Sequence, residues 1–207
     1  MTRLNNTAGL LLPLWLSVLA VTASCTTAPP KNQDNLCEIF REKGGWYEDA
    51  EDASERWGTS VPVLMAIMHQ ESRFQSDVRP PRKWYLGFIP GPRPSSAYGY
   101  SQALEMTWDH YKSVTGSGGA DRDDFDDAVD FIGWYTSRSY QTNDIKKDDA
   151  YHLYLSYHEG HNGFNKRTFR AKPWLKSVAK KVSVKSASYR RQYDSCKEDL
   201  DDGWWFF

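Results

Sequence analysis

The pattern of apolar and polar positions predicts a chain built mainly from amphipathic helices. Apolar residues recur at helical spacing in six segments, and glycine, proline or polar turn residues separate these segments. They cover roughly residues 47–57, 60–71, 103–115, 125–136, 149–159 and 166–191. A long alternation of apolar and polar residues, which is typical of half-buried strands, is missing from the sequence. The fold class is therefore predicted to be predominantly α.

One carboxylate lies on the apolar face of the second of these helices. The face is formed by Val63, Leu64, Ile67 and Met68, and the next position on it is Glu71. Burial disfavours the charged form of a carboxylate and raises its pKa, as a general acid working near neutral pH requires. The alternative is that the helix frays here and that Glu71 is a solvated end residue.

The segment from Arg79 to Ser96 cannot form a regular helix, because it contains five prolines and two glycines. It also carries Trp84, Tyr85 and Phe88, whose flat apolar faces are suited to stacking on sugar rings. We predict a long exposed loop that lines a binding cleft, with Trp84 as a substrate-binding residue. Packing of the same aromatic side chains into the core is the alternative.

The apolar run from Ala8 to Val21 is too short to span a membrane. It covers 14 residues, whereas a spanning helix needs about 20. A run of this length followed by small residues is typical of a signal peptide. Cys25 follows Ala23 and Ser24, and this arrangement resembles a bacterial lipobox, in which the cysteine becomes the lipidated first residue of the mature protein. Plain secretion and an uncleaved anchor are the alternatives.

Cysteine usage agrees with export from the cytoplasm. If Cys25 carries lipid, Cys37 and Cys196 remain as an even pair, which in an oxidising compartment is predicted to form a disulfide. The bond would close a loop of about 160 residues, for which the chain-entropy model gives about 5 kcal/mol. Two unrelated buried thiols are the alternative interpretation.

Charge excludes one class of function. The 207 residues include 26 Lys or Arg and 27 Asp or Glu, a formal net charge of −1, which argues against a nucleic-acid binder. The basic stretch 166–191 is interpreted as the solvated face of a helix, with attraction to an anionic polymer or lipid surface as the alternative. Neither the acidic run 121–130 nor the pair His158 and His161 has the spacing of a calcium or zinc site, so no metal is predicted.

Three short segments together resemble the soluble-lytic-transglycosylase family of lysozyme-like folds. That family has Glu-Ser at the end of a buried helix, then a Gly-Leu-Met-Gln-like turn, and later an Ala-Tyr-Asn-Ala-Gly-like helix end. The matching segments are His69-Gln70-Glu71-Ser72-Arg73-Phe74, Ala97-Tyr98-Gly99-Tyr100-Ser101-Gln102 and Leu155-Ser156-Tyr157-His158-Glu159-Gly160. The resemblance covers about residues 60–163. It departs from the family pattern where Tyr100-Ser101 replaces Leu-Met and His158-Glu159 replaces Asn-Ala.

The resemblance implies a single lysozyme-like domain of the goose type that acts on the glycan strands of peptidoglycan. Glu71 would be the single catalytic acid and base, cleaving the bond between N-acetylmuramic acid and N-acetylglucosamine to leave a 1,6-anhydro end. The resemblance implies a monomer that needs no cofactor. The substrate-binding residues it implies are Ser72, Gly99, Tyr100, Ser101, Gln102, Tyr154 and Tyr157.

Four regions are expected along the chain. Residues 1–24 would be the signal peptide, 25–36 a lipid-anchored tether, 37–200 the transglycosylase domain and 201–207 a tail. Lipid on Cys25 would hold the domain at a membrane facing the periplasm, and we expect this to be the outer membrane of a Gram-negative cell.

Two other functions remain open at this point. A muramidase would use water instead of an internal nucleophile, with Glu71 as the acid and a second carboxylate from Glu159 or from the acidic run 121–130. A wall-binding lipoprotein would keep the fold without turnover. Product analysis separates these functions, because hydrolysis leaves a reducing end and transglycosylation leaves an anhydro end.

Overall fold

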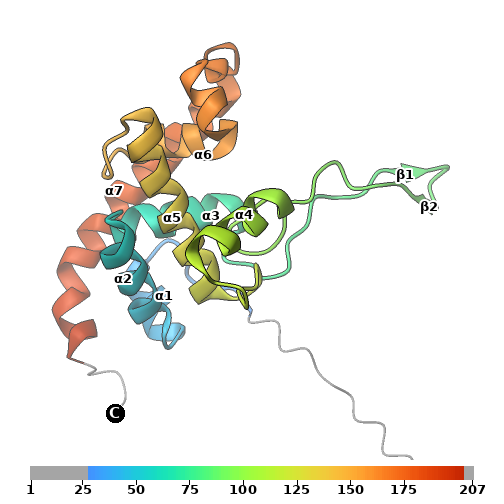
Figure 1. Ribbon diagram of the computed structural model, residues 1–207. Coiled ribbons are helices and arrows are strands. Elements are labelled where there is room, and N and C mark those ends of the chain that lie inside the picture. The colour runs from blue at the N-terminus through green and yellow to red at the C-terminus, as the bar shows by residue number, and fades with distance from the viewer. Residues whose placement is uncertain (1–27, 203–207) are drawn as a thin grey trace, which may run out of the picture.

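The computed structural model describes residues 28–202 (Figure 1). The predominantly α prediction is confirmed, since within these residues helices are joined by loops and by one short hairpin. The elements are α1 (Leu36–Glu42), α2 (Trp46–Trp57), α3 (Val61–Ser72), β1 (Trp84–Tyr85), β2 (Ile89–Pro90), α4 (Glu105–Thr115), α5 (Phe125–Asn143), α6 (Ala150–Asn165), the short 3-10 helix η1 (Thr168–Ala171) and α7 (Pro173–Asp201).

The central helix is α3, which contacts α2, α5, α6 and α7. Every residue from Val61 to Met68 is buried, so this helix is apolar on all sides, as expected for an element surrounded by others. It ends where Arg73 adopts a left-handed backbone conformation with φ of 52°. The buried start of α3 therefore fixes the position of its last turn, which carries Glu71.

Aromatic side chains fill the space between α2, α5 and the loop before α4. The rings of Trp46 and Phe125 stack with centroids 3.9 Å apart, and Tyr100 meets both edge-on. Asp130 lies on the other side of α5, where it accepts hydrogen bonds from Trp57 at 2.7 Å and Tyr111 at 2.6 Å. Asp130 thus belongs to the core packing of α2, α4 and α5.

A disulfide joins the two ends of the domain, as the sequence predicts. Cys37 on α1 is bonded to Cys196 on α7, and the two residues are 159 positions apart. The segment before α1 is attached to α7 as well, because Tyr189 donates a hydrogen bond to the carbonyl of Gln33, and Asp34 pairs with Lys185. The last part of the segment interpreted as a tether therefore packs on the domain.

The proline-rich segment forms an antiparallel hairpin that extends away from the helices (Figure 1). Trp84 pairs with Pro90 and Tyr85 with Ile89, and Leu86 and Gly87 both take positive φ values at the turn. All residues from 81 to 90 are exposed. The segment is exposed, as predicted, but it has strand pairing that the proline content did not indicate.

One helix boundary agrees with the sequence prediction and one differs. Gly160 has a non-helical backbone, with φ of 74° and ψ of 156°, so the helix that begins at Ala150 ends there as expected, and α6 continues after this kink as a second helical stretch to Asn165. The basic stretch 166–191 was expected to be one helix, but it begins with η1, and α7 starts only at Pro173. Proline is well tolerated at this first position of a helix. No helix within residues 28–202 is long and apolar enough to cross a membrane.

Candidate active site

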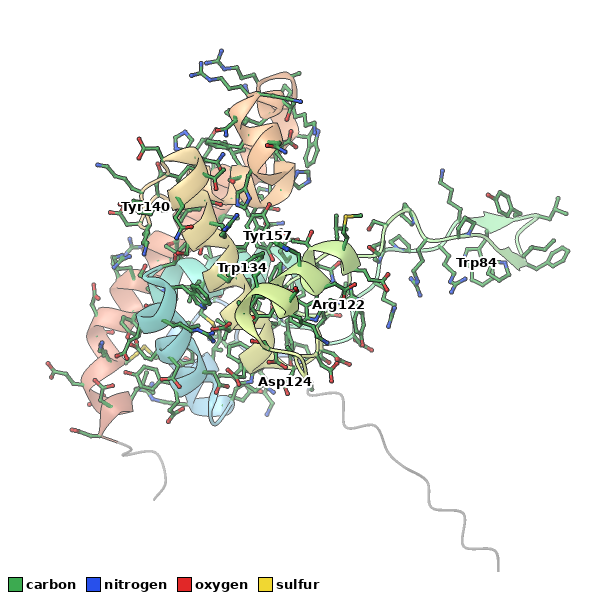
Figure 2. The ribbon with its side chains drawn as sticks, in the orientation of Figure 1. Trp84, Arg122, Asp124, Trp134, Tyr140 and Tyr157 are labelled. Carbon is green, nitrogen blue, oxygen red and sulfur yellow. A yellow bond between two sulfur atoms is a disulfide. The ribbon has the colours of Figure 1, made fainter. Side chains whose placement is uncertain are left out.

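A pocket of about 390 Å³ lies where α3, α5, α6 and the loop before α4 approach one another. Glu71 reaches it from the last turn of α3, Gln102 from the loop, and Tyr157 from α6. Phe131 and Tyr135 from α5 form the apolar side. Figure 2 shows Tyr157 within the body of the molecule, where these helices meet.

Glu71 combines a carboxyl group with a largely apolar setting. Burial raises the pKa of Glu71 to about 7, and a hydrogen bond from Tyr154 opposes that rise. Burial also raises the pKa of Tyr154, and the neighbouring Glu71 carboxylate adds to the effect. Near neutral pH, Glu71 is therefore present in both protonation states, and Tyr154 is a neutral donor beside it.

The wall formed by Tyr157 is fixed by packing on both sides. Its hydroxyl donates a hydrogen bond of 2.8 Å to the carbonyl oxygen of Ser101. Its ring meets the ring of Tyr135 edge-on at 5.0 Å, and Tyr135 in turn stacks on His161 at 4.4 Å. Burial raises the pKa of Tyr157 well above its usual value, so the side chain stays uncharged.

The loop from Gly99 to Gln102 is held by hydrogen bonds from the Gln102 side chain to backbone carbonyls. Gln102 has φ of 51°, and its side-chain amide donates hydrogen bonds to the carbonyls of Val78 at 3.0 Å and Gly99 at 2.8 Å. The hydroxyl oxygen of Ser101 is buried and has no hydrogen-bond partner within residues 28–202. Gln102 thus lines the pocket and at the same time ties the loop to the chain that follows α3.

A second carboxylate, Glu159, lines the same pocket in a different electrostatic setting. Lys172 donates a 2.7 Å hydrogen bond to it, and Thr168 and His158 also contact its oxygens. Burial alone would raise the pKa of Glu159, but these hydrogen bonds hold it below its usual value. The pocket therefore contains one carboxyl group that readily keeps a proton and one that stays ionised.

The structure brings together some of the predicted site residues and separates others. Glu71, Gln102, Tyr154 and Tyr157 lie at the pocket or in contact with Glu71, with Gly99 and Ser101 in the loop that supports it. Cys25 and the predicted signal peptide, residues 1–24, lie outside the described residues, as does most of the predicted tail 201–207.

Three predicted residues lie away from the pocket. The buried hydroxyl of Ser72 donates to the backbone carbonyl of Met68 at 3.3 Å. Tyr100 is part of the aromatic core, where it is 1% exposed. Trp84 lies on the projecting hairpin, well separated from Tyr157 (Figure 2). Ser72 and Tyr100 therefore lie in the packed interior, and Trp84 lies on a different surface from the pocket.

Sequence reasoning missed the contribution of α5 to the pocket. Phe131 and Tyr135 are one helical turn apart and both line it. The only signal was that both aromatic residues share a turn of the predicted helix 125–136, which did not separate a pocket wall from ordinary core. The described residues contain no group of three or more His, Cys, Asp or Glu side chains placed to hold a metal ion.

A family model for the transglycosylase SLT domain matches residues 13–196. The chain belongs to this family. The match covers most of the chain, including the elements that carry Glu71, Gln102 and Tyr157, and it confirms the lysozyme-like α fold. Family membership gives the protein a transglycosylase-type function on peptidoglycan. Comparisons with curated proteins and with solved structures found no match.

Proposed function

We propose that this SLT-domain protein is a lytic transglycosylase that cleaves the bond between N-acetylmuramic acid and N-acetylglucosamine and leaves a 1,6-anhydro end. The observation that carries the proposal is the position of Glu71, a carboxyl group with a pKa of about 7 at an otherwise mainly apolar pocket. One such group is sufficient when the substrate supplies the nucleophile.

The reaction uses the Glu71 carboxyl group twice, first as an acid and then as a base. Protonated Glu71 first donates its proton to the glycosidic oxygen, and the bond from the muramic C1 to that oxygen breaks. The muramic 2-acetamido group stabilises the developing positive charge at C1. The Glu71 carboxylate then takes the proton from the muramic 6-hydroxyl as that oxygen bonds to C1, which closes the anhydro ring and restores the acid.

Tyr154 and Tyr157 support this cycle in different ways. Tyr154 donates its hydrogen bond to the carboxylate that forms after the first proton transfer. Tyr157 is held against the carbonyl of Ser101 and forms a rigid wall beside Glu71. Gln102 offers a polar atom at the pocket edge for sugar or peptide groups of the substrate.

A hydrolytic muramidase is the second candidate, because Glu159 supplies another ionised carboxylate at the same pocket. In that mechanism Glu159 would activate a water molecule. The bonds from Lys172, Thr168 and His158 already occupy the Glu159 oxygens, and this favours a role for Glu159 in holding α6 against η1 and α7.

Product analysis tests the proposal directly. Purified peptidoglycan is digested with the protein, and the released muropeptides are identified by mass. Transglycosylation gives muropeptides lighter by one water than their hydrolytic counterparts, and these resist borohydride reduction. Reducible ends would instead establish the muramidase reaction, and undigested sacculi would contradict both.

The pKa of Glu71 gives a signed prediction for the pH dependence. The first step needs protonated Glu71, so kcat/KM should fall as pH rises through about 7. The Tyr154 hydrogen bond lowers this pKa, so Tyr154→Phe should move the alkaline limb of the profile to higher pH. If Tyr154 matters only for packing, its loss would lower the rate without moving the limb.

We also propose that Cys25 carries lipid and anchors the domain at the periplasmic face of the outer membrane. The support is the signal-peptide pattern of residues 1–24 and the small residues before Cys25. Cys25→Ser should abolish incorporation of radiolabelled palmitate and leave either precursor or soluble protein. Membrane attachment and palmitate labelling that persist in this variant would contradict the proposal.

A further inference from the structure

The hairpin tip is the most exposed apolar surface of the described chain that is built from neighbouring residues. Leu86 is 82% exposed and Phe88 is 72% exposed at the turn. Trp84, Tyr85 and Ile89 on the two strands are exposed as well, at 44% or more. Apolar side chains gathered on a projection in this way mark a contact surface rather than a random exposed residue.

Cations surround this tip, and anions are missing from the same stretch of chain. Arg79, Arg82, Lys83 and Arg93 flank the apolar residues, whereas no Asp or Glu occurs between Asp77 and Glu105. Within residues 28–202, the side chains of Arg82 and Lys83 have neither an ion-pair nor a hydrogen-bond partner. The hairpin therefore presents an apolar end with unpaired positive charge directly behind it.

The neck of the hairpin is held in place on the domain. Arg79 stacks on the ring of Tyr98 with its guanidinium carbon 3.8 Å from the ring centroid, and Arg93 donates a hydrogen bond to the carbonyl of Pro80. Two backbone hydrogen bonds close the tip, from Gly91 to Lys83 and from Phe88 to Tyr85. These contacts keep the apolar side chains at the end of the projection and away from the core.

We propose that this hairpin inserts shallowly into the interface of an anionic phospholipid bilayer. Tryptophan and tyrosine are the residues preferred at the level of the headgroups, and leucine, phenylalanine and isoleucine prefer the acyl boundary. Arg82 and Lys83 lie where they meet the lipid phosphates as the tip enters. Gly91 and Phe88 donate backbone hydrogen bonds across the hairpin, which reduces the number of unpaired backbone groups that would enter the interface.

A lipid surface fits the observations better than a glycan or a protein groove. Leu86 and Ile89 are aliphatic and offer sugars no ring to stack on. Trp84 on the hairpin lies apart from Tyr157, which lines the pocket (Figure 2). The apolar side chains extend to both sides of a two-residue strand pair, with every residue from 81 to 90 exposed. The apolar phase of a bilayer can cover such a tip from all directions, whereas a protein partner would need a cavity that encloses the tip.

The test places one reporter at the tip and a matched reporter elsewhere on the domain, so that insertion of the tip is distinguished from attachment through the N-terminus. The full chain carrying Cys25→Ser and Leu86→Cys is labelled with the environment-sensitive dye NBD and mixed with vesicles of phosphatidylethanolamine and phosphatidylglycerol. The emission should rise severalfold and shift to the blue, and lipids with a nitroxide near the headgroup should quench it. The matched control carries the dye at Glu55→Cys, an exposed site on α2, and should not respond.

Removing charge tests the electrostatic half of the proposal. In the Leu86-labelled chain, Arg82→Gln with Lys83→Gln should weaken the response to anionic vesicles about fivefold for each cation removed. The wild-type hairpin should respond much less to vesicles of phosphatidylcholine alone.

Three outcomes would overturn the proposal. A dye at position 86 that stays water-like on anionic vesicles excludes insertion. A response of equal strength on neutral vesicles excludes the anionic preference. Shielding by purified sacculi without any response to vesicles reassigns the hairpin to the glycan. None of these measurements depends on turnover, so they remain informative if the proposed reaction is wrong.

Discussion

Glu71→Gln should reduce the turnover of peptidoglycan by at least about a hundredfold, and by as much as about ten-thousandfold, the range typical for loss of a positioned general acid and base. Glutamine has nearly the same shape and can keep a contact with Tyr154, but it cannot donate and recover a proton. The measurement is the rate of release of soluble muropeptides at pH 6.5, with wild type and variant at equal concentration.

The same variant should remain folded, which separates loss of chemistry from loss of structure. Burial raises the pKa of Glu71 above its value in the unfolded chain, so the folded state becomes less stable as pH rises from about 4.5 through about 7. Glutamine has no charge to bury. At pH 8 the melting temperature of Glu71→Gln, measured by circular dichroism, should therefore equal or exceed that of wild type.

Glu159→Gln is the matched control, because it makes the same chemical change to a carboxylate that lines the same pocket. Under the single-acid mechanism it should cost less than about tenfold in rate, which is the scale of one weakened hydrogen-bond network. Its melting temperature should fall, since Lys172 and Thr168 lose an ionised partner. A collapse of turnover in both variants would instead support a two-carboxylate hydrolase.

The position of Glu71 could be predicted because it depends on local periodicity. An apolar face on residues 63–68 fixes which side of α3 points inward, and Glu71 continues that face one turn later. The disulfide was predictable for another reason, which is that only a few cysteines were available to pair. Neither inference required knowledge of how the helices pack.

The positions of Trp84, Tyr100 and Tyr135 depend on packing and could not be obtained in this way. An aromatic ring in a proline-rich loop has the same sequence signal whether it stacks on sugar, enters the core or projects into solvent. Tyr100 replaces an apolar residue of the family pattern and keeps the apolar role, with its ring against Trp46 and Phe125. Local spacing contains no information about which partner is opposite.

Gly99→Ala should lower the free energy of unfolding of the domain by about 3 kcal/mol or more. Gly99 has φ of 75°, and a Cβ atom built there would lie 1.9 Å from the carbonyl oxygen of Arg122. That oxygen belongs to a backbone group that accepts the hydrogen bond from Tyr100 at 3.1 Å, so it cannot simply rotate away. A clash with fixed backbone is among the few mechanisms that give single-residue losses of this size.

Gly116→Ala separates the clash from the cost of a positive φ. Gly116 follows α4 with φ of 78°, nearly the same as Gly99, but nothing lies within 4 Å of a Cβ atom built there. An alanine at Gly116 should therefore cost only the left-handed strain, about 1–2 kcal/mol. The difference between the two variants isolates the contact between Gly99 and the carbonyl of Arg122.

Both free energies of unfolding are measured by urea denaturation at pH 7, with the slope of each transition checked against wild type. Gly99→Ala should also lower kcat by more than the loss of folded protein explains. The reason is that the loop that must move carries Gln102 and the carbonyl that accepts the hydrogen bond from Tyr157. Gly116→Ala should keep wild-type kcat. Equal losses of stability in the two variants would show that the loop shifts freely, and Gly99 would then have no special part in building the pocket.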